Sequence, residues 1–229
     1  MAKVDLRLDW CSHAAAKYAV EHWHYSKTMP CGKNIYVGVW ENKTFIGVVV
    51  FGTGAAPQAS SPYKLKRQQV CELVRVSLRE HISPVSKVVA VALRFLKKKC
   101  PLLRIVISYA DPEQDHRGVI YQAGNWVYTG PTGPCVHFVN SKTGKRIHSK
   151  TLKTGRRGYA TQLLASGAVT QIKLWKHKYL YPLDKAMKEQ IEPLRQPYPK
   201  RAGSETGDTS DDQSEEGGST PTPALQLKT

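Results

Sequence analysis

The chain has 229 residues, 41% of them hydrophobic, which is enough to build a buried core in one domain of ordinary size. It carries 34 Lys and Arg against 18 Asp and Glu, a formal net charge of +16. Residues 202–229 hold six acids and one lysine, which leaves 33 basic and 12 acidic side chains in residues 1–201. This charge favours a polyanionic partner, most often nucleic acid, with a merely basic protein as the alternative.

Cysteine usage and hydropathy exclude several classes of protein. The five cysteines are odd in number and form no C-x-x-C pair, which argues against a disulfide framework or a structural zinc site. The first five residues lack the apolar segment of a signal peptide. The longest apolar run, Val88–Phe95, contains Arg94 and is too short to span a bilayer. We therefore expect a protein that does not associate with membranes and that keeps its cysteines as thiols in a reducing cytosol.

The first half of the chain alternates strands and helices. Ser12 and a run of alanines favour an early helix, and Ser83-Pro84 favours the start of a second one. The predicted elements are a strand at Val4–Trp10, a helix from Ser12 to about His22, a hairpin of strands at Ile35–Trp40 and Thr44–Phe51, a strand at Val70–Leu78, and a helix at Pro84–Lys99.

The second half is built on the apolar run Leu102–Tyr109, which predicts a buried central strand that ends before Pro112. Residues after Ala202 show no periodicity and predict a disordered acidic tail. The other predicted elements are a short helix at Gly118–Ala123, strands at Asn125–Tyr128 and Val136–Val139, a short helix at Tyr159–Leu164, one late strand at Gln171–Tyr181, and a short helix at Lys185–Ile191.

This order of elements predicts the fold class. An early hairpin followed by alternating strands and helices fits one α+β domain over residues 1–201, better than a doubly wound sheet. We expect a mixed, mainly antiparallel sheet with helices on both faces, followed by the tail at residues 202–229.

Polar side chains gather after the central strand. Asp111, His116, Tyr121, Asn125 and Trp126 lie within 16 residues of each other, next to the carboxyl end of a strand, where open sheets bind ligands. Taken singly, each of these residues fits an ordinary structural role in a polar loop, a helix cap or the core, and Trp126 fits the core best. The cluster as a whole predicts a functional site.

Basic segments predict contacts with a DNA backbone. Three basic residues follow a Gly- and Ser-rich loop, where a solvated loop is an equal alternative, and Ser141–Arg157 is the most basic segment. Asn125 suits either an adenine edge or a helix cap. The predicted DNA-binding residues are Lys64, Lys66, Arg67, Asn125, Lys142, Lys145, Arg146, Lys150, Lys153, Arg156 and Arg157.

Three motifs carry a resemblance to a known family. The order of elements resembles the GNAT acyltransferase fold. His24-Tyr25-Ser26, Asp111-Pro112 and Gly118–Ala123 with Asn125-Trp126 resemble the Mom family of phage DNA-modification proteins, over roughly residues 5 to 190. The resemblance implies catalytic roles for His24, Tyr25, Asp111 and Tyr121.

The resemblance also implies a reaction. Mom proteins convert adenine in duplex DNA to an N6-carbamoylmethyl (methylcarbamoyl) form, which protects phage DNA from restriction in the cytoplasm of the bacterial host. An enzyme that reaches adenine N6 must extrude the base from the duplex, so the expected partner is double-stranded DNA with a flipped adenine.

Two cofactors follow from the resemblance. It implies iron, for which His24, Asp111 and Tyr121 are the matching ligands. It also implies acetyl-CoA, or another acyl or glycine-derived donor, because simple acyl transfer would not give the family's product. GNAT enzymes hold the CoA pyrophosphate on a glycine-containing loop, whereas the corresponding loop, Leu78–Pro84, has no glycine. We therefore expect donor contacts from Arg75, Ser77 and Ser83, the last at a helix N-terminus.

Other functions remain open at this point. A GNAT N-acyltransferase acting on a small amine or protein needs no DNA, and a non-catalytic basic DNA-binding protein needs no His-Tyr-Asp-Tyr set. A metal-dependent nuclease usually needs more well-placed carboxylates than Asp111 alone. The acidic tail is expected to compete with DNA for the basic domain.

Overall fold

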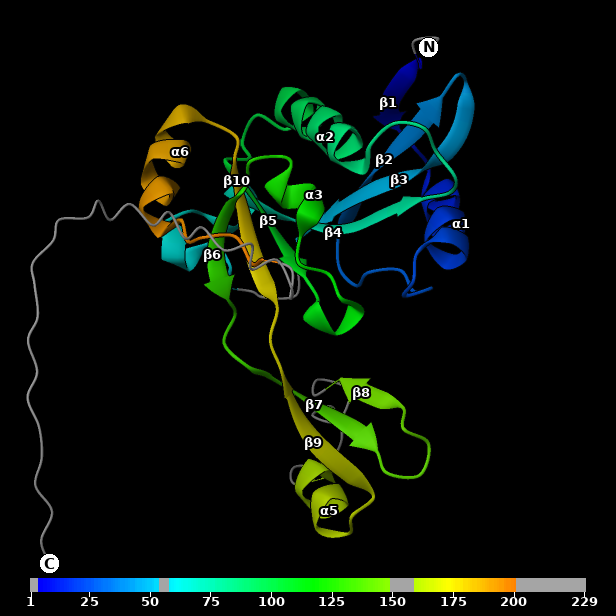
Figure 1. Ribbon diagram of the computed structural model, residues 1–229, viewed down its shortest axis with the longest axis vertical. Helices are drawn as coiled ribbons and strands as arrows, with labels where there is room; N and C mark the ends of the chain where they lie inside the picture. Colours follow the sequence, from blue (N-terminus) through cyan, green and yellow to red (C-terminus); the bar gives the residue numbers. More distant parts are fainter. Residues whose placement is uncertain (1–3, 54–57, 149–158, 201–229) are drawn as a thin grey trace, which may run out of the picture. The chain divides into compact units, whose positions relative to one another are not determined.

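The computed structural model describes residues 4–53, 58–148 and 159–200. A seven-stranded sheet with helices on both faces dominates it (Figure 1). The strand order is β1-β2-β3-β4-β5-β10-β6, and the pair β4/β5 is parallel. Its strands are β1 (Leu6–Trp10), β2 (Asn34–Glu41), β3 (Thr44–Gly52), β4 (Val70–Leu78), β5 (Ile105–Ala110), β6 (Val127–Pro131) and β10 (His177–Pro182).

Helices cover the two faces because strand residues alternate between them. In β5, Ile105 and Ile107 pack in the cluster that contains α6, whereas Val106 packs in the cluster that contains α2. The side chains of α1 pack against Val48 and Val50 of β3. The helices are α1 (His13–Trp23), α2 (Val85–Lys99), α3 (Val119–Gln122) and α6 (Lys185–Ile191). The predicted α+β class, with a mixed, mainly antiparallel sheet and helices on both faces, is confirmed.

A second, three-stranded sheet is inserted between β6 and β10. Its strand order is β8-β7-β9, and Figure 1 shows it grouped with α5 apart from the large sheet. We call residues 135–174 the arm. Its elements are β7 (Cys135–Asn140), β8 (Arg146–His148), α5 (Tyr159–Ala165) and β9 (Val169–Leu174).

The prediction of one late strand at Gln171–Tyr181 was wrong. The segment forms two strands, β9 in the arm and β10 in the large sheet, which break between Leu174 and His177. At the break, Lys176 and Thr132 exchange two hydrogen bonds, of 2.8 and 3.0 Å. The alternation of apolar residues does not indicate which sheet a strand joins. The sequence pattern therefore predicted one strand across the break.

Smaller differences concern the ends of elements. The central strand begins at Ile105 rather than Leu102, whose side chain is exposed. Residues 1–198 form one unit, and the predicted boundary at residue 201 stays a prediction, because the tail at residues 202–229 lies outside the described residues. Among the described helices, none has the length and apolar character needed to cross a membrane.

The large sheet opens between β4 and β5. The two strands pair only from Val70 with Ile105 to Leu73 with Ser108, although β4 continues to Leu78 and β5 to Ala110. The register of β3 with β4 also shifts beside this point. Such an irregularity bends a strand away from its neighbour. Because β4 and β5 are parallel, both carboxyl ends border the opening.

Candidate active site

A cleft of about 390 Å³ lies at the opening between β4 and β5. We call it the wedge. Its walls come from the end of α1, from β4 and β5, and from the loop and helix after β5. Among its lining residues are His24, Tyr25, Arg75, Tyr109, His116 and Tyr121. The fold therefore brings together three stretches of chain that are distant in the sequence, residues 23–25, 73–85 and 109–121.

His24 presents a neutral imidazole to the wedge. Its Nδ1 accepts a hydrogen bond from the backbone N–H of Ser26 at 3.1 Å, and Ser26 Oγ lies 2.8 Å away. Because a backbone amide only donates, the neutral ring carries its proton on Nε2. Burial lowers the pKa of His24 to about 4, assisted by the charges of Arg75 and His116. At neutral pH, His24 is therefore a hydrogen-bond donor at Nε2.

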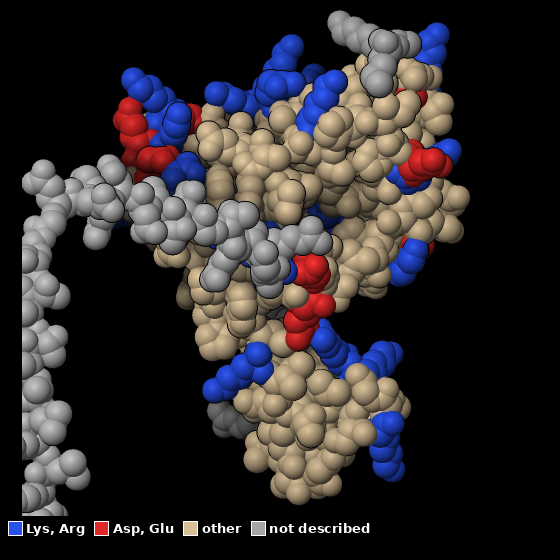
Figure 2. All heavy atoms as spheres, viewed as in Figure 1, with Lys and Arg blue, Asp and Glu red and all other residues tan. Residues whose placement is uncertain are grey.

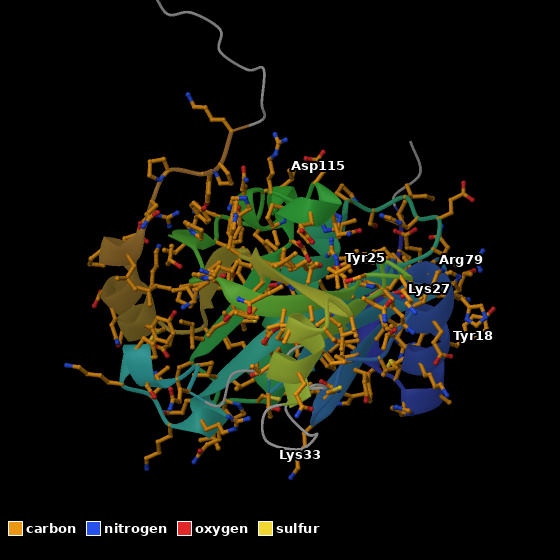
Figure 3. The ribbon with its side chains drawn as sticks, turned by 90° about the horizontal axis from the view of Figure 1, so that it is seen from below. Tyr18, Tyr25, Lys27, Lys33, Arg79 and Asp115 are labelled. Carbon is orange, nitrogen blue, oxygen red and sulfur yellow. The ribbon has the colours of Figure 1, made fainter. Side chains whose placement is uncertain are left out.

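Tyr25 and His116 form the outer wall of the wedge. The ring centroid of Tyr25 lies 4.2 Å from that of His24 and 5.4 Å from that of His116. Tyr25 is 56% exposed, and in Figure 3 it lies between the labelled side chains of Asp115 and Lys27. Burial of its hydroxyl raises the pKa of Tyr25 against the opposing effect of Arg75. Tyr25 is thus a protonated, accessible aromatic surface beside two imidazoles.

Arg75 carries an unsatisfied donor. Its Nη1 donates to the carbonyl of Val74 at 2.7 Å, and its buried Nε finds no hydrogen-bond partner in the described part of the chain. An orphaned buried N–H is costly, so it commonly marks the place of a ligand atom. Arg75 lines the wedge, so its guanidinium and the Nε2–H of His24 give the wedge donors that can hold and polarise a carbonyl or carboxylate oxygen.

Tyr121 and Asp111 are held by other groups. Tyr121 Oη lies 2.8 Å from Ser108 Oγ, and burial raises the pKa of Tyr121 to about 12. Asp111 Oδ1 accepts from the backbone of Glu113 at 3.1 Å, and Oδ2 lies 3.7 Å from Lys176 Nζ. Tyr121 lines the wedge, whereas Asp111 caps the turn that carries His116.

The predicted iron site is not supported. The described residues contain no group of three or more His, Cys, Asp or Glu that could hold a metal ion. Of the predicted ligands His24, Asp111 and Tyr121, the imidazole lies beside the Arg75 cation and the phenol is protonated and hydrogen-bonded. The Asp111 carboxylate is also held, by the Glu113 backbone and by Lys176, so this set does not offer iron the free imidazole and carboxylate ligands that it prefers.

The loop before α2 already holds an anion from the protein. Glu41 Oε2 accepts from the backbone N–H of Ile82 at 2.9 Å, and Oε1 accepts from that of Ser83 at 2.7 Å. Both amides lie in the loop Leu78–Pro84, which corresponds to the CoA-binding loop implied by the resemblance, so they are not free for a pyrophosphate. Ser83 was predicted as the helix cap, but Pro84 stands at that position.

Only one of the three predicted donor-binding residues lines the wedge. Arg75 does so, whereas Ser83 is buried beside Glu41. Ser77 is fully buried, and its hydroxyl donates to the carbonyl of Ala19 at 2.7 Å. We therefore do not retain Ser77 and Ser83 as donor contacts.

Replacing Glu41 with alanine should lower the free energy of unfolding by about 2 kcal/mol, because two backbone donors lose a charged acceptor. Burial opposes ionisation of Glu41, but hydrogen bonds from Ile82 and Ser83 outweigh it and hold its pKa below the ordinary 4.5. The stabilisation is therefore complete above pH 4.5 and is lost as the pH falls through the lower folded-state pKa. Urea denaturation at several pH values measures both effects; equal stabilities at pH 7 would contradict this role, and Glu21→Ala on the surface of α1 is the control.

Glu72 is a residue that sequence reasoning did not assign. It is the third residue of β4, and burial, with a smaller contribution from the Glu72 charge, raises the pKa of Tyr109 to about 12. The same charge also raises the pKa of Tyr121. Its carboxylate therefore lies near both tyrosines at the opening. The sequence signal that could have identified Glu72 is an acidic residue inside a largely apolar strand.

The predicted DNA-binding residues fall on separate surfaces. Lys64, Lys66 and Arg67 are exposed around the short helices before β4. Asn125 is exposed in a turn with φ +56°, which suits its alternative role as a cap. Lys142, Lys145 and Arg146 lie in the arm and are exposed. Lys150, Lys153, Arg156 and Arg157 lie outside the described residues.

The arm is free of acidic residues. The sequence contains no Asp or Glu between Asp115 and Asp184, and Figure 2 shows Lys and Arg without acids on the visible face of the arm. Arg146 pairs with Glu113, which precedes His116 in the loop of the wedge. The arm is thus a positively charged surface next to the candidate active site.

Comparisons with known proteins agree with the motifs. The chain matches the model of the Mom protein family over residues 5–200. It is 25% identical over 130 residues to the protein described as methylcarbamoylase mom of Escherichia phage Mu, which covers 55% of this chain. The match spans about half of that relative, 54% of its length.

Several solved structures are similar at low sequence identity. They include an N-acetyltransferase from Staphylococcus aureus Mu50, with a TM-score of 0.43 and 12% identity over 78% of this chain and 98% of that one. FeeM, an N-acyl amino acid synthase from uncultured soil microbes, has a TM-score of 0.46 and 10% identity over 82% and 94%. The family assignment rests on the match over residues 5–200, and by that match the chain belongs to the Mom protein family.

Proposed function

We propose that this protein is a DNA-modifying transferase that converts adenine in duplex DNA to its N6-carbamoylmethyl form. It would act in the cytoplasm of a phage-infected bacterium and protect phage DNA from restriction. Membership of the Mom family supports this, as does the similarity to a methylcarbamoylase of phage Mu. The acid-free arm supplies the charge that a DNA backbone requires.

One observation carries the proposal. The wedge is lined by His24, which carries its proton on Nε2, by the Arg75 guanidinium and by the accessible ring of Tyr25. The group to be transferred ends in a carboxamide, whose carbonyl oxygen accepts two hydrogen bonds. Two fixed donors would orient that group and draw electron density away from its methylene carbon.

The transfer needs one further group. Adenine N6 forms a bond to the methylene carbon, the bond from that carbon to the donor's leaving group breaks, and one N6 proton is lost. His116 lines the wedge next to Tyr25 and would accept this proton. Tyr121 and Asp111 would act by position, Tyr121 in the wall and Asp111 by capping the turn before His116.

Mass spectrometry of nucleosides tests the proposal directly. Plasmid DNA from cells that express the full chain should contain a deoxyadenosine in which a carbamoylmethyl group replaces one N6 hydrogen. DNA from cells with the empty vector should lack it. An N-acetyl adduct would instead indicate plain acyl transfer, and unmodified DNA would contradict the proposed reaction.

A further inference from the structure

Trp175 is an exposed aromatic side chain that the proposed function has not used. All five tryptophans lie in the described residues, and two of them have exposed side chains, Trp10 at 43% and Trp175 at 42%. A single exposed ring is common on protein surfaces, so its place in the fold decides what it means. Trp175 lies at the break between β9 of the arm and β10 of the large sheet.

The outer face of β9 suits a nucleic acid. Gln171, Lys173 and Trp175 are exposed, whereas the two residues between them are half-buried. Successive side chains of an extended chain point to opposite faces, so these three share the outer one. An amide, a cation and an aromatic ring, on an arm without acidic residues, match a phosphate backbone and the flat faces of bases.

The fold places Trp175 beside the wedge. β10 runs antiparallel to β5 with His177 opposite Ala110, so the residues before His177 continue past the carboxyl end of β5. Lys176 Nζ lies 3.7 Å from Asp111 Oδ2, in the loop that borders the wedge. Trp175 is therefore one residue away from a direct contact with that loop.

Rigid neighbours hold the indole in place. Its ring centroid lies 4.9 Å from that of His177, in an edge-to-face contact at 87°. His177 is buried, and its Nδ1 lies 2.8 Å from Tyr128 Oη. On the other side, Lys176 and Thr132 exchange their two hydrogen bonds, where Figure 1 shows the two connections to the arm running side by side. A ring on such a support loses little freedom when it binds.

The proposed reaction needs a residue of this kind. Extrusion of a paired adenine leaves a gap in the base stack, and the lost stacking and pairing cost free energy that the enzyme must offset. Proteins that unstack a base step frequently insert an apolar side chain between the bases. The arm can hold the backbone, but a positive charge does not fill the gap.

We propose that Trp175 inserts its indole ring into the base stack beside the target adenine and holds the duplex open while that base enters the wedge. This inference rests on the proposed function, since it names the residue that gives the reaction access to a paired base. Trp175 contacts the neighbouring bases rather than the reacting atoms, so it is a positioning residue.

The linking number of a plasmid tests insertion without requiring turnover or a known target sequence. Closed circular plasmid is relaxed by a topoisomerase in the presence of the full-length protein and is then deproteinised. The wild type should lower the linking number, because base pairs that are forced apart unwind. Trp175→Ala should reduce this shift about fivefold at equal occupancy of the DNA, and Trp175→Phe, which keeps a flat ring, should retain about half of it.

Trp10→Ala is the matched control. Trp10 has the same exposure and a similar edge-to-face contact, 4.7 Å from Phe95, but it lies on β1 at the edge of the large sheet. This variant should unwind the plasmid like the wild type, and thermal denaturation should show that all variants are folded. Unwinding by Trp175→Ala equal to that of the wild type would overturn the inference, as would a wild type that does not unwind DNA.

Denatured DNA separates insertion from a purely structural role. The purified protein is given plasmid, either as duplex or as heat-denatured strands, with an ultrafiltrate of host lysate as the source of the donor. Trp175→Ala should lower adenine modification of the duplex about tenfold and leave that of the separated strands unchanged, because only a paired base must be extruded. Equal losses on both substrates would contradict insertion, since they would indicate damage to the site itself.

The same data distinguish the two proposals. If the protein leaves adenine unmodified but unwinds DNA through Trp175, the transferase proposal fails and the inserting residue stands. If adenine in duplex DNA is modified and Trp175→Ala changes neither modification nor unwinding, the transferase proposal stands and this inference fails.

Discussion

Replacing His24 with alanine should reduce the yield of modified adenine about 100- to 1000-fold, the usual effect of losing one fixed donor at a reacting oxygen. The expectation follows from the tautomer: Nδ1 accepts from the Ser26 backbone, so Nε2–H faces the wedge as a donor. Nucleoside mass spectrometry of plasmid DNA, with expression levels matched, measures the change.

His22 offers a matched control two residues away. It is exposed, and its ring nitrogen lies 2.8 Å from the carbonyl of Tyr18 on the outer face of α1. His22→Ala should keep the wild-type yield, and both variants should melt near the wild-type temperature. A folded His24→Ala protein with full activity would remove His24 from the mechanism.

The pH profile gives an independent check on His24. Its folded-state pKa of about 4 is below the ordinary 6.5, so the ring stays neutral as the pH falls from 7 to 5. The variant His24→Gln, which keeps an N–H donor, should recover part of the lost activity across this range. If the activity of His24→Gln instead equals that of His24→Ala at every pH, donation by Nε2–H is not the role of His24.

Neutralising the arm should weaken binding to duplex DNA by about two orders of magnitude at 0.1 M salt. The variant combines Lys142→Gln, Lys145→Gln and Lys173→Gln, all of them exposed on the arm. Each phosphate contact that is lost also lowers the slope of log affinity against log salt by about 0.9, so the slope should fall by two to three. Fluorescence anisotropy with a labelled duplex at several salt concentrations measures both quantities.

The control variant removes the same charge elsewhere. Lys97, Lys98 and Lys99 are exposed in the last turn of α2, and their replacement by glutamine changes the net charge equally. A purely non-specific effect of net charge would weaken DNA binding in both variants alike. That result would contradict a DNA-binding role for the arm, whereas a large effect in the arm variant alone is expected.

Local patterns in the sequence were enough for most of the elements. Ser12 caps α1 through its side chain, and the apolar stripe of α2 faces the core, as its spacing requires. The motifs at His24-Tyr25 and Asp111-Pro112 also identified the segments that border the site. These features depend on neighbouring residues, and neighbouring residues are visible in a sequence.

The long-range placement of side chains was not accessible in the same way. Ser77 and Arg75 are two residues apart in β4, yet one hydrogen-bonds to α1 and the other lines the wedge. Glu41 lies 42 residues from the Ser83 amide that it accepts from, so nothing near Ser83 in the sequence indicates that the amides before α2 already have an acceptor.

The sequence by itself determined the α+β class, the charge of the domain and the family, because composition, periodicity and short motifs are properties of local stretches of chain. The tertiary structure decided which strands pair, where β4 and β5 part, and which polar groups already have partners. Those outcomes depend on contacts between distant residues, whose hydrogen bonds and burial are settled only when the whole sheet forms.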